Sequence, residues 1–234
     1  MVEKPFTLQL DQSRELFALS KKKNLEILVD HTFLYDSTIQ YIQKIVENGA
    51  IGDLIHISFE RSNLGPIRTD VNSSWDLSTH DISILLALVN EMPLDISSEG
   101  FSIIGTGVED VVNTSLTYEK LFVTLFASWL HPEKTRKIKI VGSKKMIVWD
   151  GMLFGEEVKI FDKGYEINNN QDSYTNLTQI RNGDILVPNI QKSEPLKEVV
   201  LDFYNKILGE DINRLNTEQL TNNVVEIMEK INLK

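Results

Sequence analysis

A succession of short apolar segments in the middle of the chain constrains its fold more than any other feature. The expected strands share β-branched and aromatic residues and are Ile96–Ile104, Val111–Tyr118, Phe122–Trp129, Lys137–Val141, Met146–Trp149 and Val158–Phe161. Short polar or glycine-bearing turns separate them, such as Gly142-Ser143. Successive strands on short turns favour an antiparallel sheet. A further strand precedes them, because Ile55, Ile57 and Phe59 alternate with polar residues, as in a half-buried strand.

The first part of the chain has a different pattern. Asp11–Lys23 and Asp36–Asn48 are expected helices, and Leu25–Val29 is an expected strand between them. Such alternation is typical of a parallel α/β unit. Further helices are expected near Thr79–Val89, Pro195–Leu208 and Thr217–Ile231, and Asn168–Asn182 is expected to be an irregular loop. The sequence therefore predicts an α+β fold, with a short α/β unit followed by a large, mostly antiparallel, open-faced sheet with flanking helices.

Composition limits the classes of function. The 234 residues include no Cys, which excludes a disulfide framework and a cysteine nucleophile and fits a reducing compartment. The formal net charge of −10 argues against a nucleic-acid or anionic-membrane partner. There is no secretory signal and no apolar run of the ~20 residues that a membrane span needs. We expect a cytoplasmic protein.

The glycines do not form a phosphate-binding turn. The 12 glycines contain no G-x-G-x-x-G, although Gly105 and Gly107 come closest, with Asp110 at the third position. If the chain acts with a dinucleotide, the cradle for its phosphates lies elsewhere.

Lys4 stands between Glu3 and Pro5 near the start of the chain. Proline keeps the preceding residue out of the helical region, so Lys4 is extended. A lysine fixed in this way suits an ammonium group that hydrogen-bonds a substrate oxygen. A solvated terminal lysine is the commoner case, and these residues alone favour it.

The densest polar cluster is Trp75–Asp81. Asp76 and His80 are four residues apart, so they share one face of a helix, and together they could take the proton of a hydroxyl group. In the alternative, which spacing alone favours, Ser78 or Thr79 is an N-cap and His80 is a surface group. Catalytic zinc generally takes three protein ligands and this pair offers two, so we expect no metal site.

Two further segments offer ligand-binding side chains. The segment His31–Tyr35 follows an expected α/β strand, where ligands often bind, although aromatic packing is at least as common. Arg61 and Arg68, with Asn72, flank a Gly-Pro stretch, and such arginines can hold a phosphate or carboxylate. Usually such residues are solvated.

Three motifs in register resemble the Gfo/Idh/MocA family of NAD(P)-dependent oxidoreductases. They are Glu3-Lys4-Pro5, His31–Tyr35 and Trp75–Asp81. The last is similar to the family's D-x-G-x-H-D signature, with Ser78 where glycine is commoner. Asn63–Trp75 and the stretch from Gly183 to Lys197 resemble the branch that acts on nucleotide sugars.

The resemblance implies two parts of the chain. Residues 1–35 would be the C-terminal remnant of a Rossmann-type dinucleotide-binding domain, and residues 36–234 a substrate and oligomerisation domain. The chain would begin inside the first domain and would be inactive alone. A homodimer or homotetramer would form through the sheet face.

The resemblance also implies a reaction, in which hydride passes between the nicotinamide of NAD or NADP and a hydroxyl or ketone of a sugar or nucleotide sugar. Lys4 would hydrogen-bond the reacting hydroxyl, His80 would be general base or acid, and Asp76 would position the substrate. The implied cofactor contacts are Glu3, Lys4, Pro5, His31 and Phe33. The implied substrate contacts are Lys4, Tyr35, Arg61, Arg68, Asn72, Asp76 and His80.

Two alternatives stay open at this point. One is a non-catalytic oligomerisation or sugar-binding module derived from the same family, which the absence of a glycine-rich turn favours. The other is a glycoside hydrolase that uses the family fold with bound NAD. Retention of Lys4, Asp76 and His80 favours the oxidoreductase.

Overall fold

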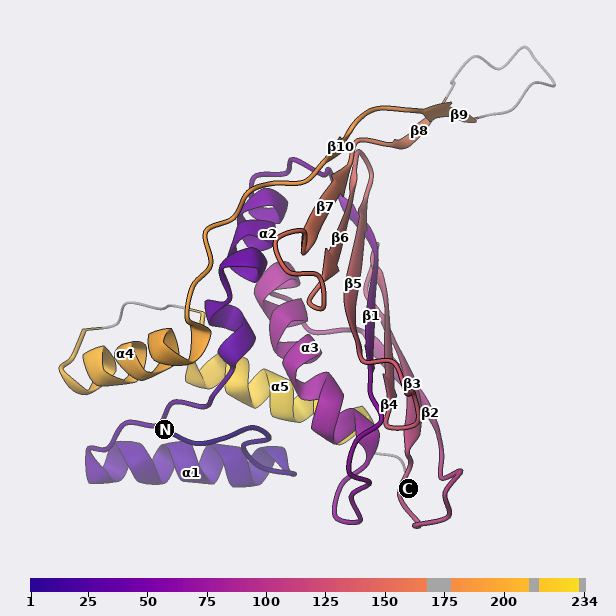
Figure 1. Ribbon diagram of the computed structural model, residues 1–234. Coiled ribbons are helices and arrows are strands. Elements are labelled where there is room, and N and C mark those ends of the chain that lie inside the picture. The colour runs from indigo at the N-terminus through magenta and orange to yellow at the C-terminus, as the bar shows by residue number, and fades with distance from the viewer. Residues whose placement is uncertain (168–177, 211–214, 232–234) are drawn as a thin grey trace.

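The computed structural model describes residues 1–167, 178–210 and 215–231 of the chain. It consists of one eight-stranded sheet with helices packed against a single face (Figure 1), and a separate two-stranded ribbon at one end. The predicted α+β fold with a large open-faced sheet is confirmed. Most of the loop expected at Asn168–Asn182 lies outside the described residues, and its end forms strand β9 (Thr178–Arg181) instead.

The strands of the main sheet run in the order β10-β7-β6-β5-β1-β4-β3-β2. Their bounds are β1 Leu54–Ser62, β2 Asp95–Phe101, β3 Val111–Thr117, β4 Phe122–Ser128, β5 Thr135–Gly142, β6 Met146–Asp150, β7 Val158–Phe161 and β10 Ile185–Leu186. The ribbon pairs β8 (Gly164–Ile167) with β9. All the strands expected between Ile96 and Phe161 are present, with ends displaced by up to three residues.

Strand β1 lies at the centre of the sheet and makes it mixed. It pairs antiparallel with β5 and parallel with β4. The parallel pair arises because helix α3 (Ser73–Val89) crosses the sheet after β1, so the chain re-enters the sheet at β2 and reaches the centre only with β4. All the other pairs in this sheet are antiparallel, as expected.

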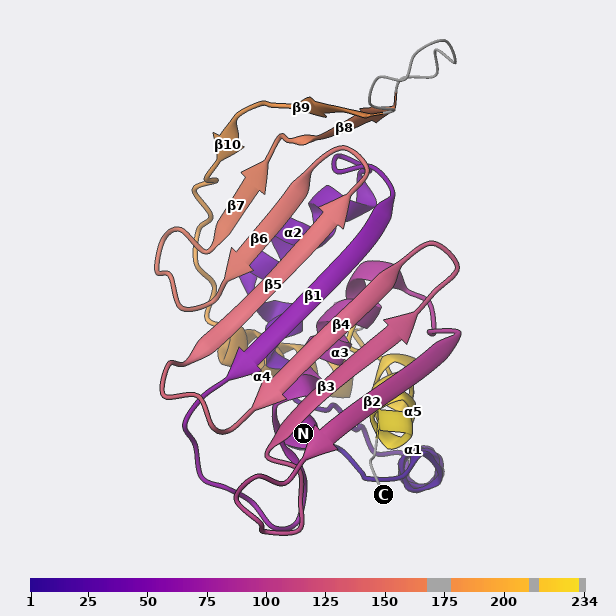
Figure 2. The ribbon, with the colours of Figure 1, turned by 90° about the vertical axis from the view of Figure 1, so that its right-hand side faces the viewer.

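The helices form one layer with its own internal packing. Helix α3 packs against β1 and β4, α5 (Glu218–Ile231) packs against α3, and α1 (Leu10–Lys23) packs against α5. Helix α2 (Ser37–Glu47) also contacts α3, and α4 (Pro195–Ile207) contacts the 3₁₀ helix η1 (Thr32–Tyr35). The core lies between this layer and the sheet, and the other sheet face is open (Figure 2). No helix in the described ranges is long and apolar enough to cross a membrane.

The predicted strand Leu25–Val29 is wrong over most of its length. The structure has only one isolated parallel bridge there, between Val2 and Val29. Its hydrogen bonds join Val2 N to Leu28 O (2.9 Å) and Asp30 N to Val2 O (2.8 Å). Leu25 is 63% exposed, so the apolar composition of this segment does not correspond to burial on a sheet.

Helix α3 begins six residues before its expected start at Thr79. Asn72 is the N-cap, and its side chain accepts a hydrogen bond from Trp75 N at 3.1 Å. Ser78 and Thr79, the alternative caps, are buried inside the helix. The earlier start is explained by the asparagine cap together with the buried Trp75 in the first turn. It places both Asp76 and His80 on regular helix.

Candidate functional site

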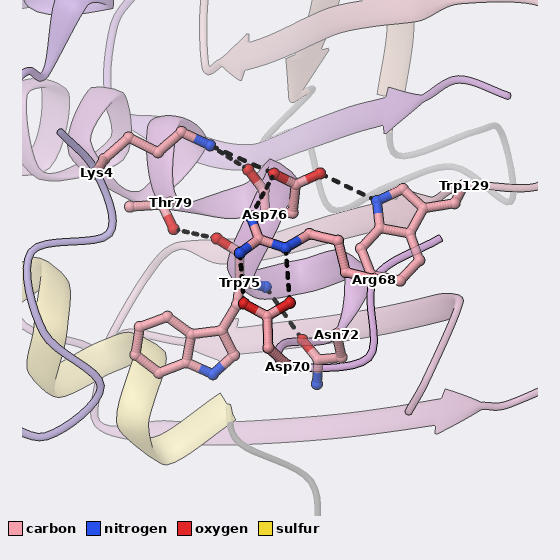
Figure 3. A network of polar contacts seen from close by, with 8 residues as sticks. All are labelled: Lys4, Arg68, Asp70, Asn72, Trp75, Asp76, Thr79 and Trp129. Carbon is pink, nitrogen blue, oxygen red and sulfur yellow. Dashed lines mark hydrogen bonds and ion pairs between the residues drawn. The ribbon is translucent and has the colours of Figure 1, made fainter. Parts of the chain in front are cut away.

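Lys4 reaches the first turn of α3 from the N-terminal segment (Figure 3). Its Nζ donates a hydrogen bond to the backbone carbonyl of Asp76 at 2.5 Å and lies 3.7 Å from Asp76 Oδ1. The Lys4–Pro5 peptide bond is cis. Burial lowers the pKa of Lys4, as do the charges of Arg61 and Arg68, while Asp76 raises it. Asp76 therefore holds the Lys4 ammonium close to the cations Arg61 and Arg68.

Asp76 is fixed from several sides. Trp129 Nε1 donates to Asp76 Oδ2 at 3.1 Å, and Trp129 itself is 1% exposed. Arg68 Nη1 lies 3.9 Å from Asp76 Oδ1, although Arg68 makes its closest contacts with Asp70. Figure 3 shows Asp76 at the centre of this network, between Lys4, Arg68 and Trp129. The carboxylate thus has a defined position in front of Lys4.

His80 lies one helical turn after Asp76 and is kept neutral. Burial lowers its pKa well below the usual value, and the charges of Arg61, Lys4 and Arg136 lower it further. Its Nδ1 is buried without a hydrogen-bond partner among the described residues. The Phe33 ring meets the imidazole edge-on, with ring centroids 4.9 Å apart. A neutral imidazole can accept a proton, which is the chemistry of a general base.

These side chains line a common cavity of about 180 Å³. It is lined by Lys4, Asp76 and His80, and by the basic residues Arg61, Lys134 and Arg136. The volume is below the ~300–1,000 Å³ typical of pockets for drug-sized ligands, so the cavity holds only part of a larger ligand.

Arg61 lies at the end of β1, and Arg136 faces it from β5. Arg61 is 4% exposed, and its Nε lies 2.7 Å from Oδ1 of the buried Asp81. The Cζ atoms of Arg61 and Arg136 lie 4.4 and 5.9 Å from the centroid of the Phe33 ring. Burial raises the pKa of Asp81, and Arg61 lowers it. The wall of the cavity is therefore strongly basic.

Part of the chain matches a known family model. Residues 39–148 match the family model of the GFO/IDH/MocA C-terminal domain. Residues 39–148 therefore belong to a GFO/IDH/MocA C-terminal domain. The resemblance of its motifs to that family is thereby confirmed.

Curated relatives agree with this assignment. The chain is 25% identical over 142 residues to UDP-N-acetylglucosamine 3-dehydrogenase of Acidithiobacillus ferrooxidans, a match that covers 60% of this chain and 44% of the relative. It is 27% identical over 127 residues to the uncharacterized oxidoreductase YrbE of Bacillus subtilis, which covers 50% of this chain and 37% of that protein. The matched stretches thus span less than half the length of these relatives.

Solved structures share the fold. A putative oxidoreductase from Magnetospirillum magnetotacticum superposes with a TM-score of 0.77 at 20% identity, over 97% of this chain and 70% of that one. An inositol dehydrogenase homolog from Azotobacter vinelandii, complexed with NADH and myo-inositol, superposes with a TM-score of 0.74 at 15% identity. The match covers 98% of this chain and 67% of that one.

Several expected site residues do not line the cavity. Tyr35 Oη donates to Asp202 Oδ2 at 2.5 Å and accepts from Asn216 at 3.0 Å, in a buried network against α4. Asn72 caps α3 and bonds Glu109. Arg68 pairs with Asp70 beside the site.

His31 also lies apart from the cavity. It is 1% exposed, and its Nε2 lies 3.4 Å from Thr221 Oγ1 on α5. Burial lowers its pKa to about 4. Of the expected cofactor contacts, Lys4 and Phe33 are near His80, Pro5 follows Lys4, and Glu3 is exposed.

Sequence reasoning missed Arg136, Lys134 and Trp129. A signal for Arg136 was present, because it shares a strand face with the apolar Ile138 and Ile140, but the expected strand began one residue later. Trp129 was the last residue of an expected strand, and nothing in the sequence pairs it with Asp76.

The described residues do not fit the diphosphate of a dinucleotide. A helix N-terminus preceded by a glycine-rich turn is the usual cradle. The residues that precede α1, α2, α3 and α4 are Gln9, Asp36, Asn72 and Glu194. No glycine-rich turn precedes these four helices, so the described residues offer no built site for the cofactor phosphates.

Proposed function

We propose that this chain supplies the substrate side of an NAD(P)-dependent oxidoreductase that acts on a hydroxyl or ketone of a sugar or nucleotide sugar. The observation that carries the proposal is the common cavity of Lys4, Asp76 and His80. It unites a hydrogen-bond donor, a positioning carboxylate and a neutral imidazole from segments about seventy residues apart in sequence. Such a set suits reversible proton transfer at an alcohol oxygen.

Each residue has a distinct role in this proposal. Lys4 Nζ donates a hydrogen bond to the reacting oxygen in both directions, and its lowered pKa makes it a stronger donor. A ring nitrogen of His80 accepts the hydroxyl proton in the oxidising direction. Asp76 holds the Lys4 ammonium in place, and Trp129 holds Asp76. Positioning of this kind is a large part of catalysis.

The substrate class rests on the relatives. One is named a UDP-N-acetylglucosamine 3-dehydrogenase, and a structure with the same fold is complexed with myo-inositol and NADH. Both names describe oxidation of a secondary alcohol on a polyhydroxylated ring. Residues beyond those described would hold the phosphates of NAD or NADP.

We further propose that the open face of the sheet forms a homodimer or homotetramer in the cytoplasm. The exposed Phe122 on this face, stacked on His56 with ring centroids 6.0 Å apart, supports an interface between copies. A cytoplasmic location is supported by the absence of Cys.

A sugar-binding or oligomerisation module is the second candidate function. It is favoured by the lack of a glycine-rich turn before the helices α1 to α4. The two functions differ in hydride transfer. A binding module binds the sugar nucleotide but transfers no hydride, even when the cofactor site is complete.

Hydride transfer tests the proposal. In a cofactor-complete form of the protein, Lys4→Met removes the ammonium and keeps the length of the side chain, and we expect kcat/KM to fall about 10²-fold or more. Lys120→Met, in an exposed turn, is the matched control and should change nothing. Unchanged turnover in Lys4→Met, with correct folding by circular dichroism, would contradict the proposed role, and no hydride transfer in the wild type would favour the module.

A further inference from the structure

The basic wall of the cavity contrasts with the charge of the whole chain. The protein has a formal net charge of −10, yet Lys4, Arg61, Lys134 and Arg136 all line this cavity. Asp76 is the carboxylate that lines it with them, and Asp81 lies behind Arg61. A concave site with charge of one sign concentrates ligands of the opposite sign. The site is therefore built to attract an anion.

Arg61 and Arg136 lie directly opposite each other in the sheet. They are partners in the antiparallel register of β1 and β5. Like charges at such positions destabilise a sheet. Burial and the charge of Arg61 both lower the pKa of Arg136, while Asp81 raises it. One buried carboxylate thus faces two guanidinium groups, and a bound anion would offset the remaining repulsion.

The hydrogen bonding of Arg61 is also incomplete. Its Nε is bonded to Asp81, but its Nη2 is buried with no partner among the described residues. Leaving a buried charged donor unpaired is costly. The guanidinium forks of arginine match the two oxygens of a carboxylate or phosphoryl group.

The size of the cavity indicates where this anion belongs. Lys4, His80 and the two arginines share about 180 Å³, which is room for one part of a ligand. A group bound by the arginines is therefore close to the oxygen that Lys4 and His80 contact.

We propose that Arg61, Lys134 and Arg136 form a subsite for an oxyanion, a carboxylate or a phosphoryl group, on the sugar ring that reacts. This inference rests on the proposed function, whose substrate class it narrows to acidic sugars. Arg136 and Lys134 would then determine specificity, while Lys4 and His80 act on the reacting oxygen.

The test compares ligands that differ only in the ring substituent. Calorimetry on the 234-residue chain measures Kd for UDP-N-acetylglucosamine and for its uronate, and for glucosamine and glucosamine 6-phosphate. We expect one acidic ligand to bind about tenfold or more tightly than its neutral parent, as charge-assisted hydrogen bonds allow. The diphosphate is common to both nucleotide sugars, so its own binding cancels from that comparison.

Substitutions in the subsite test whether its residues cause the preference for acidic ligands over their neutral parents. Arg136→Gln should remove most of it, and Lys134→Gln, at an exposed position, should reduce it without risk to the fold. Lys139→Gln is the matched control, because Lys139 is exposed and lies on β5 with its side chain on the opposite face from Ile138 and Ile140. This control should keep the full preference.

The outcomes separate the two proposals. Equal affinity for both members of each pair, or equal weakening of both by Arg136→Gln, overturns the subsite even where hydride transfer succeeds. Binding of glucosamine 6-phosphate that depends on Arg136, with no hydride transfer in the cofactor-complete protein, supports the subsite and contradicts the proposed function. Absence of binding by every ligand overturns the subsite.

Discussion

At the scale of single residues, Asp76 connects the N-terminal segment to the helical layer. Its backbone carbonyl and carboxylate both face Lys4, and its other carboxylate oxygen accepts from Trp129. The ion pair is long, at 3.7 Å, and the Asp76 side chain is 30% exposed, so it contributes little to stability. The pair therefore fixes the direction of the ammonium more than it stabilises the fold.

Buried His31 gives the protein a specific response to acid. Its pKa is about 4 in the folded state, against the ordinary value of 6.5, so the unfolded chain binds the proton more readily between these values. We expect the free energy of unfolding to fall as the pH drops from about 6.5 toward 4. Urea titrations across this range measure it. His31→Gln should lose less stability over the same range than the wild type, and an equal loss in both would contradict this origin.

The gathering of Lys4, Asp76 and His80 could be expected from the sequence, since their spacing follows a family pattern. Arg136 could not, because its approach to Arg61 depends on the register between β1 and β5. The position of Tyr35 outside the site could not be predicted either, because its hydrogen-bond partners Asp202 and Asn216 come from the last quarter of the chain.

At the scale of elements, α3 determines the geometry of the site. Its hydrophobic spacing predicted a helix, but its start was hidden by the serines around Trp75, which are poor helix formers. The Asn72 cap compensates for this composition. Strand periodicity predicted the sheet segments well, but the parallel pairing of β1 with β4 is a tertiary feature that local periodicity does not contain.

Removal of the Asn72 cap should weaken the protein and the site together. Asn72→Ala deletes the acceptor for Trp75 N, and we expect a loss of about 1 kcal/mol in the free energy of unfolding. Frayed residues near Asp76 should also weaken substrate binding. Asn72→Ser keeps a capping oxygen and is the control. If chemical denaturation gives alanine and serine variants the same stability as the wild type, the cap does not hold the start of α3.

At the scale of the whole molecule, the layers divide the surface into different roles. Helices cover one face of the sheet, the opposite face is open, and the site lies where the ends of β1, the start of β5 and α3 meet the N-terminal segment (Figures 1 and 2). The side chains of the proposed reaction and the proposed interface between copies are therefore on different parts of the fold. A change at one should leave the other intact.

Phe122 tests the proposed interface. It is 46% exposed on the open sheet face, so Phe122→Glu should convert dimers or tetramers to monomers in sedimentation velocity. Phe154→Glu is the matched control, because Phe154 is 91% exposed in the turn between β6 and β7. A wild-type chain that is already monomeric at micromolar concentration would contradict the interface, as would a Phe122→Glu variant that remains associated.

The role of His80 as the base at the reacting oxygen is tested most directly by hydride transfer in the cofactor-complete protein. His80→Asn should lower kcat by about 10²–10⁴-fold while the fold is kept. The same substitution at His56, on the open sheet face, should leave kcat near the wild-type value. Equal kcat for wild type and His80→Asn would contradict the account.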